Sequence, residues 1–247
     1  MRFKLRFITD KPELPIEYRK FFTSYIKNAL HNSINGDLLK RYYTDTHTKD
    51  FTWTLIVSRP RFASGKLEFS DNRFSVIFSA DDKAQTGMYL MLAFLNQKNK
   101  RYPTENGNGV ILKEVVQIDQ KEIQGTSVRF TTMPGASIVV RDHDRESNKD
   151  TYYCCGEPDY EIRLRQALKT QAQMAGFSGR MTDEIDVHLI SGKKVVIRHY
   201  GVYLDASIAD FVVFADHVLL QHFYLNGVCS RRSIGFGMVD VVEEGEA

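Results

Sequence analysis

The sequence predicts an α+β protein made of two similar halves, and three observations support this prediction. Short runs typical of strands are interleaved with segments of helical periodicity. The order strand, helix, strand, strand, helix, strand occurs up to residue 122, and antiparallel strands with two helices occur again from residue 126. Hydrophobic residues make up 43% of the 247-residue chain and charged residues 26%, which is ordinary for a globular protein with a buried core.

The first half starts with a strand in which Phe3, Leu5 and Phe7 alternate with basic residues. The basic face of this strand is expected to face solvent. A helix follows, in which aromatic residues recur at helical spacing. The remaining elements of this half are a strand at 50–57, a hairpin at 66–79 turning at Asp71 and Asn72, a helix at 83–97 and a strand at 109–118.

The second half follows a short polar connector and is expected to repeat the theme of the first, antiparallel strands with two helices. Its elements are a hairpin at 127–141 around Pro134 and Gly135, a polar loop at 141–159, a helix at 160–177, a hairpin at 185–200 turning at Ser191 and Gly192, a strand at 208–215, a helix at 216–227 and a last strand at 237–242. Asp216 and Gly227 are suitable caps for the last helix. Two tandem ferredoxin-like (βαββαβ, RRM-like) domains, 1–122 and 126–247, are therefore predicted.

Composition excludes several classes of function. The net charge is only +2, so a polyanion must be bound by local clusters of basic residues and not by bulk charge. The three cysteines are too few for a disulfide scaffold, and their spacing fits no zinc site. No cofactor or metal is expected. No apolar run approaches the length of a membrane span, and we expect a reduced cytoplasmic protein.

The segment GVCSRRSIGFGMV, residues 227–239, combines three glycines and two arginines just before the last strand. Glycine permits positive φ angles and the close approach of another backbone, while arginine binds phosphate through a two-pronged guanidinium. The segment has neither the lysine of a Walker loop nor the βαβ context of a dinucleotide fingerprint. A loop of this kind suits an extended polymer backbone better than a mononucleotide. The simpler alternative is a plain turn.

This glycine-rich loop resembles the signature loop of the CRISPR-associated precursor-RNA-processing endoribonucleases, the Cas-six type of the repeat-associated mysterious protein superfamily. The stretches MRFKLRF, FTWTLIV and FTTMPGASIVVRDHD also fit this family. Cys229 stands where the family usually has glycine. The resemblance implies two ferredoxin-like domains and cleavage of CRISPR repeat RNA without metal. In that reaction the 2′-hydroxyl attacks the adjacent phosphate and leaves 2′,3′-cyclic phosphate and 5′-hydroxyl ends.

The family places its catalytic residues in or after the first helix, which here offers His31, Tyr43, His47 and Lys49. By this resemblance, His47 is the general base or acid, Lys49 stabilises the developing charge, and Tyr43 orients or carries a second proton. His31 is the rival histidine. The predicted RNA-binding residues are Gly227, Ser230, Arg231, Arg232, Ser233, Gly235 and Gly237 in the loop, with Lys193, Lys194 and Arg198 near a predicted hairpin tip.

Two other functions stay open at this point. One is a non-catalytic RNA-binding subunit of a CRISPR effector complex, which would need no His47 and Lys49 pair. The other is an unrelated α+β enzyme whose glycine-rich loop holds a small phosphorylated ligand. The expected partners are CRISPR repeat RNA and other effector subunits, with no membrane. The chain is expected to be a monomer or a homodimer.

Overall fold

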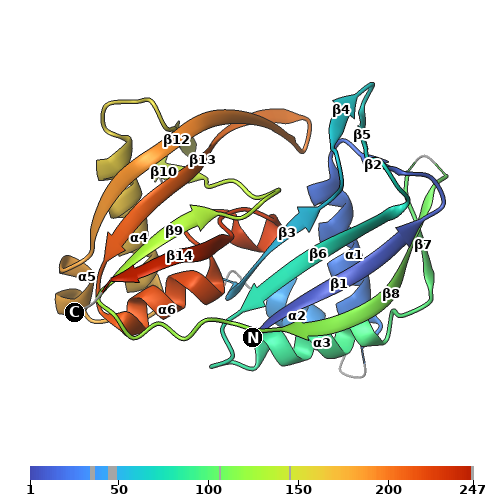
Figure 1. Ribbon diagram of the computed structural model, residues 1–247, viewed down its shortest axis with the longest axis horizontal. Helices are drawn as coiled ribbons and strands as arrows, with labels where there is room; N and C mark the ends of the chain where they lie inside the picture. Colours follow the sequence, from blue (N-terminus) through green and yellow to red (C-terminus); the bar gives the residue numbers. More distant parts are fainter. Residues whose placement is uncertain (34–36, 44–48, 106, 145, 246–247) are drawn as a thin grey trace.

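The computed structural model describes residues 1–33, 37–43, 49–105, 107–144 and 146–245. Two antiparallel sheets lie side by side, one in each half of the chain (Figure 1). Each sheet carries its helices on one face, and the segment 119–126 joins the halves. The β12–β13 hairpin of the C-terminal half arches toward the N-terminal half (Figure 1).

The N-terminal sheet has the order β3-β6-β1-β8-β7. Four of its strands and two helices follow one another as a βαββαβ unit, in which the second and third strands pair and the first strand lies at the centre. These elements are β1 (Arg2–Thr9), α1 (Tyr18–His31), β3 (Phe51–Ile56), β6 (Arg73–Ala80), α3 (Thr86–Leu95) and β8 (Gly109–Ile118), with β7 (Arg101–Pro103) added at the edge. The short helix α2 (Asp37–Tyr43) precedes β3, and a small sheet is formed by β2 (Glu13–Pro15), β4 (Arg61–Ala63) and β5 (Lys66–Glu68).

The C-terminal sheet has the order β12-β13-β9-β14, which is the same βαββαβ arrangement. Its elements are β9 (Ser127–Thr132), α4 (Tyr160–Met174), β12 (Asp186–His199), β13 (Val202–Phe214), α6 (His217–Asn226) and β14 (Val239–Gly245). The additions are a hairpin of β10 (Val140–Asp144) and β11 (Lys149–Tyr153), the short helix α5 (Gly179–Asp183) and the 3₁₀ turn η1 (Arg232–Ile234). The tandem ferredoxin-like fold is confirmed, while the exact boundaries at 122 and 126 stay a prediction.

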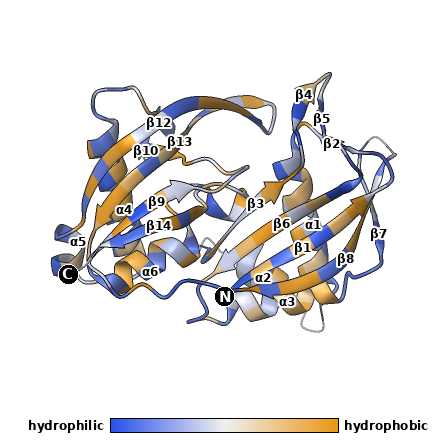
Figure 2. Ribbon diagram, in the orientation of Figure 1, coloured by the Kyte–Doolittle hydropathy of each residue, from blue (hydrophilic) through white to orange (hydrophobic). Residues whose placement is uncertain are grey.

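The predicted alternation of β1 is confirmed, and it explains the N-terminal core. Phe3, Leu5 and Phe7 are almost completely buried, and Phe7 stacks on Phe74 with 4.8 Å between ring centroids. Figure 2 shows hydrophobic and hydrophilic segments alternating along this strand. Aromatic pairs of this kind add about 0.5–1.5 kcal/mol each beyond the area they bury.

Arg2 lies on the opposite face of β1, and the prediction that this face is exposed to solvent is wrong at Arg2. Its side chain is buried and donates hydrogen bonds to the carbonyl oxygens of Tyr224 and Val239 in the C-terminal half, at 2.9 and 2.7 Å. The guanidinium also lies 3.6 Å from the centroid of the Tyr224 ring. Alternation predicted which face Arg2 occupies but not that the second half covers that face.

Four predicted local elements are wrong. The strands β5 and β6 belong to different sheets and form no hairpin at Asp71 and Asn72. The chain turns at Pro134 and Gly135, but β9 pairs with β13 and β14 and not with the segment that follows. The predicted polar loop at 141–159 contains the β10–β11 hairpin.

The predicted hairpin at 185–200 is the single strand β12, and its turn to β13 lies at residues 200–201. The pairing register shifts between Leu189 and Ser191, which marks a bulge just before Gly192. A Cβ on Gly192 would come within 2.5 Å of the Cys155 sulfur, so close packing and not a turn accounts for this glycine.

Candidate nucleic-acid interface

The glycine-rich loop, residues 227–239, links α6 to β14 and packs between the two halves of the chain. Three successive residues of β3 donate hydrogen bonds to this loop or to the carbonyl of Pro134. Thr52 Oγ1 donates to the Phe236 carbonyl at 2.8 Å, Trp53 Nε1 donates to the Ser233 carbonyl at 3.1 Å, and Thr54 Oγ1 donates to the Pro134 carbonyl at 2.8 Å. Two separate family-like stretches of the sequence, FTW and the loop, are therefore in direct contact.

The loop glycines are required by both conformation and space. Gly235 and Gly237 have φ angles of +89° and +73°, in the region that side chains disfavour. A Cβ on Gly237 would lie 2.1 Å from the Val228 carbonyl oxygen, and one on Gly235 would lie 2.9 Å from the Trp53 ring. Arg19 Nε of α1 donates to the Gly235 carbonyl at 3.1 Å. The glycines thus allow the loop to fit closely against β3 and α1.

At least six of the thirteen N–H groups of the loop donate to partners inside the protein. The amides of residues 228, 230, 234, 235 and 237 donate to backbone carbonyls, and the Cys229 amide donates to Gln171 Oε1 at 2.7 Å. Gln171 Nε2 in turn donates to the Gly227 carbonyl at 2.9 Å. These amides are therefore not free to hold an anion, which the loop would bind through its side chains and its other amides.

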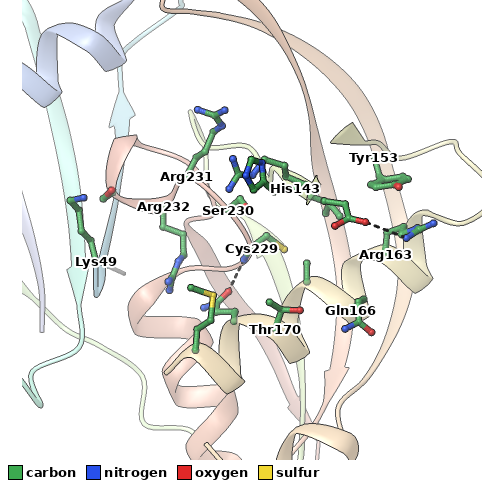
Figure 3. A pocket seen from close by; sticks show the side chains of 17 residues that line it. Lys49, His143, Tyr153, Arg163, Gln166, Thr170, Cys229, Ser230, Arg231 and Arg232 are labelled. Carbon is green, nitrogen blue, oxygen red and sulfur yellow. Dashed lines mark hydrogen bonds and ion pairs between the residues drawn. The ribbon is translucent and has the colours of Figure 1, made fainter. Parts of the chain in front are cut away.

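A cavity of about 520 Å³ opens beside the loop, and Figure 3 shows its lining side chains. It is enclosed by the β10–β11 hairpin, by α4, by the loop itself and by Lys49 of the N-terminal half. Five cationic side chains line it against the single carboxylate of Asp142; the cations are Lys49, Arg141, Arg163, Arg231 and Arg232. The size falls within the range of about 300–1,000 Å³ that is typical of ligand pockets. The charge favours an anionic ligand.

The two arginines of the loop have different environments. Arg231 is about a quarter exposed, and its guanidinium donates to the Tyr152 hydroxyl at 2.8 Å and lies 3.4 Å from Asp150 Oδ2. Arg232 is 8% exposed, and its guanidinium lies 3.4 Å from the Asn226 carbonyl. Burial lowers the pKa of Arg232 to about 10, against an ordinary value of 12.5. Arg231 is therefore the better placed of the two to reach a phosphate.

Lys49 is the predicted catalytic residue that the structure places at the cavity. Burial and the positive charge of Lys27 lower its pKa. The Nζ atoms of Lys49 and Lys27 lie 5.2 and 4.9 Å from the centroid of the Tyr43 ring. The Tyr43 hydroxyl is buried without a hydrogen-bond partner among the described residues, and burial raises its pKa. The Tyr43 ring is thus placed to orient Lys49.

Of the two predicted catalytic histidines, only His31 lies within the described residues. His47 lies outside the described residues. His31 is the last residue of α1, is exposed, and is not among the side chains that line the cavity. Their catalytic roles stay predictions.

The predicted basic residues on β12 lie away from this cavity. Lys193 and Lys194 lie inside the strand and not at a hairpin tip, because the turn is at residues 200–201. Lys194 pairs with Asp205 at 2.7 Å, and Arg198 is exposed nearer the turn. These side chains do not line the cavity, so any RNA contact they make is a separate one.

Sequence reasoning missed the contribution of the β10–β11 hairpin. Arg141 and His143 line the cavity from β10, and Arg163 lines it from α4 (Figure 3). The segment is polar because it is an exposed two-stranded ribbon, and polarity alone indicated a loop. The available signal was the pair of valines in VVRDHD and the threonine and two tyrosines in KDTYY, which are residue types that favour strands.

Among the residues with described positions, no group of three or more histidine, cysteine, aspartate or glutamate side chains could hold a metal ion. No helix in the described part of the chain is both long and apolar enough to cross a bilayer.

The family "CRISPR associated protein Cas6, C-terminal" matches residues 118–241, which is half of the chain. No curated protein sequence matches this chain. Three similar solved structures are a RAMP protein binding different RNA substrates (20% identity, TM-score 0.79, 98% of this chain and 100% of that one), the product of a Cas6-related gene from Pyrococcus furiosus (19%, 0.80, 99% of each) and a Cas6 product complex (11%, 0.69, 98% and 99%). At these identities the structures establish the fold. The match to the family, together with the glycine-rich loop and the tandem ferredoxin-like fold, shows that the chain belongs to the Cas6 family of CRISPR-associated proteins.

Proposed function

We propose that the protein is a metal-independent endoribonuclease that cleaves CRISPR repeat RNA in the precursor transcript. The cavity between Lys49 and the glycine-rich loop is the observation that carries this proposal, because it combines a strongly cationic lining with residues from both halves of the chain. The fold of the chain is similar to that of a Cas6 product complex, and this similarity supports the proposal.

In the proposed reaction, the 2′-hydroxyl of one nucleotide attacks the adjacent phosphorus. The bond from phosphorus to the 5′-oxygen then breaks, and the products carry a 2′,3′-cyclic phosphate and a 5′-hydroxyl. Lys49 is placed to stabilise the negative charge that develops on the phosphate oxygens. Arg231 binds a neighbouring phosphate, and Tyr43 holds Lys49 in position. Ser230 and Ser233 line the same cavity and can donate to phosphate oxygens.

The remaining predicted residues are assigned as follows. His47 or His31 supplies a proton-transfer group from the N-terminal half. Gly227, Gly235 and Gly237 act through the fit of the loop, and Arg232 acts through its position beneath it. Lys193, Lys194 and Arg198 contact the RNA outside the cavity. The protein works in the cytoplasm, as a monomer or homodimer, with repeat RNA and other CRISPR effector subunits as its partners.

A non-catalytic RNA-binding subunit is the second candidate, and two observations favour it. A solved structure that superimposes over nearly the whole chain is described as a RAMP protein binding different RNA substrates. In the described residues, Arg231 is also already engaged by Asp150 and Tyr152, so it must exchange partners to hold a phosphate.

The test uses labelled repeat RNA incubated with the protein in EDTA, beside the same RNA with one 2′-deoxy nucleotide at the cleaved position. The endoribonuclease predicts one discrete cut with a 2′,3′-cyclic phosphate end, which the deoxy substitution abolishes. A Lys49→Ala variant is expected to lose about 10²-fold or more in rate. Salt-sensitive binding without a cut would favour the RNA-binding subunit, and an absence of both would reject RNA as the ligand.

A further inference from the structure

The β10–β11 hairpin carries a histidine–aspartate pair that the proposed function has not used. His143 and Asp150 are directly opposite each other in the hairpin, so their side chains share one face. The distance between His143 Nδ1 and Asp150 Oδ1 is 2.8 Å. The histidine is 40% exposed, and it lines the same cavity as Lys49 and Arg231 (Figure 3).

Asp150 is held firmly enough to orient the imidazole. Arg141 NH1 contacts both of its carboxylate oxygens at 3.1 Å, and the Tyr152 hydroxyl donates to it at 3.0 Å. Partial burial of Asp150 raises its pKa, but the hydrogen bonds from His143, Tyr152 and Arg141 outweigh burial and lower it overall. The carboxylate therefore stays ionised at neutral pH and accepts the proton on Nδ1 of His143.

This arrangement fixes which ring nitrogen is free. With Nδ1–H directed at Asp150, the lone pair of the neutral imidazole is on Nε2, and no described residue hydrogen-bonds to Nε2. A carboxylate behind a histidine also stabilises the cation that forms when the ring accepts a proton. The charged groups near the pair come from three elements: Arg141, Asp142, Asp144 and Asp150 on the hairpin, Arg163 on α4 and Arg231 on the loop.

His143 is also the one imidazole among the described residues that line the cavity. Histidine is the side chain whose charge changes near neutral pH, as proton transfer in this reaction requires. The other titratable groups at this place are less suitable. Lys49 is a cation at the edge of the cavity, and Tyr43 has a buried hydroxyl and a raised pKa.

We infer that His143, oriented by Asp150, is the general base of the RNA cleavage reaction, supplied by the C-terminal half. This inference rests on the proposed function, in which His143 takes the place of His47 or His31 as the base. Nε2 takes the proton of the 2′-hydroxyl, and the 2′-oxygen forms a bond to the adjacent phosphorus. The bond from phosphorus to the 5′-oxygen breaks, and the departing oxygen takes a proton from water. His143 then returns its proton to water, while Asp150 acts as a positioning residue.

The experiment compares His143→Ala with His188→Ala in single-turnover cleavage of repeat RNA across a range of pH. His188 is a matched control because it also lies beside an aspartate, with 3.5 Å from its Nε2 to Asp186, but is exposed on β12 away from the cavity. Loss of a general base is expected to slow His143→Ala by about 10²–10⁴-fold. A rise in rate with pH is expected for the parent protein, and it should be absent from this variant and present in His188→Ala.

Two further measurements separate base catalysis from other roles. Affinity for the uncleavable 2′-deoxy RNA should be the same in His143→Ala and the parent, and a large loss would mean that His143 only binds RNA. A substrate with sulfur in place of the 5′-oxygen at the cut needs no acid. The variant should stay equally impaired on this RNA relative to the parent, and a rescue would make His143 the acid and overturn the inference.

The failure of this inference is distinguishable from failure of the proposed function. If the parent protein does not cut repeat RNA at all, the proposed function fails. If the parent and His143→Ala cut at the same rate, the endoribonuclease stands and His143 is not its base.

Discussion

Substituting Gly237 by alanine tests whether the glycine-rich loop is built for close packing. The φ angle at Gly237 is +73°, and a Cβ there would lie 2.1 Å from the carbonyl oxygen of Val228. The Val228 amide donates to the Gly237 carbonyl at 2.8 Å, so the two ends of the loop are held together at this point. Because the clashing atom belongs to the backbone, no side-chain rotation relieves it.

The magnitude follows from two separate costs. An alanine at positive φ costs about 1–2 kcal/mol, and overpacking of a filled site adds about 1–3 kcal/mol. Gly237→Ala should therefore lower the free energy of unfolding by about 2–5 kcal/mol. Gly201→Ala is the matched control, because Gly201 has a φ of +79° but nothing within 4 Å of the added Cβ. That variant should lose only the conformational part, about 1–2 kcal/mol.

Urea unfolding of the parent and the two variants, followed by tryptophan fluorescence, measures these differences. Trp53 is the single tryptophan and donates a hydrogen bond to the loop, so its emission reports on this region. A Gly237→Ala loss within 0.5 kcal/mol of the Gly201→Ala loss, a margin of about the size of an ordinary surface effect, would refute the packing explanation.

Three other changes have defined outcomes. Arg2→Met leaves two buried carbonyls without donors and should cost about 2–5 kcal/mol in urea unfolding, whereas Arg6→Met, at an exposed pair with Glu114, should change stability by less than about 1 kcal/mol. Tyr43→Phe should cut RNA at close to the parent rate, because the Tyr43 hydroxyl has no described hydrogen-bond partner. Tyr43→Ala should be slower, because Lys49 loses its contact with the Tyr43 ring. Equal rates for the two variants would contradict the orienting role of the ring. His222, whose Nδ1 lies 3.7 Å from Asp81 Oδ2, lowers the pKa of Asp81 from 3.8 to about 2 despite partial burial. The contribution of Asp81 to stability is therefore present above pH 4 and is lost as pH falls toward 2. Asp81→Asn should weaken the acid dependence of thermal unfolding in that window, and an unchanged acid limb would contradict this.

Local patterns in the sequence predicted the elements whose residues alternate or repeat strongly. Phe3, Leu5 and Phe7 defined β1 and its buried face, and Asp216 and Gly227 correctly marked the ends of α6. In the structure the Asp216 carboxylate accepts from the Val218 amide at 2.8 Å, as an N-cap does. These features depend on neighbours in sequence, which is why a single sequence reveals them.

Features that depend on distant segments could not be predicted in this way. Gly192 looks like a turn residue until Cys155 is known to lie against it. Arg2 looks like a surface residue until the second half of the chain covers it. The same is true of the candidate site. Lys49 and Arg231 could each be predicted singly from the sequence, whereas the role inferred for His143 depends on its pairing with Asp150 and its place in the cavity.

The central claim is that RNA is bound and cut in the cavity between Lys49 and the glycine-rich loop. Photocrosslinking tests it most directly, with 4-thiouridine placed on either side of the scissile phosphate in a 2′-deoxy repeat RNA, followed by mapping of the crosslinked peptides. We expect crosslinks to peptides that contain Lys49, the β10–β11 hairpin or residues 227–239. Crosslinks confined to another surface, such as the face of the N-terminal sheet around Arg6 and Arg73, would contradict it.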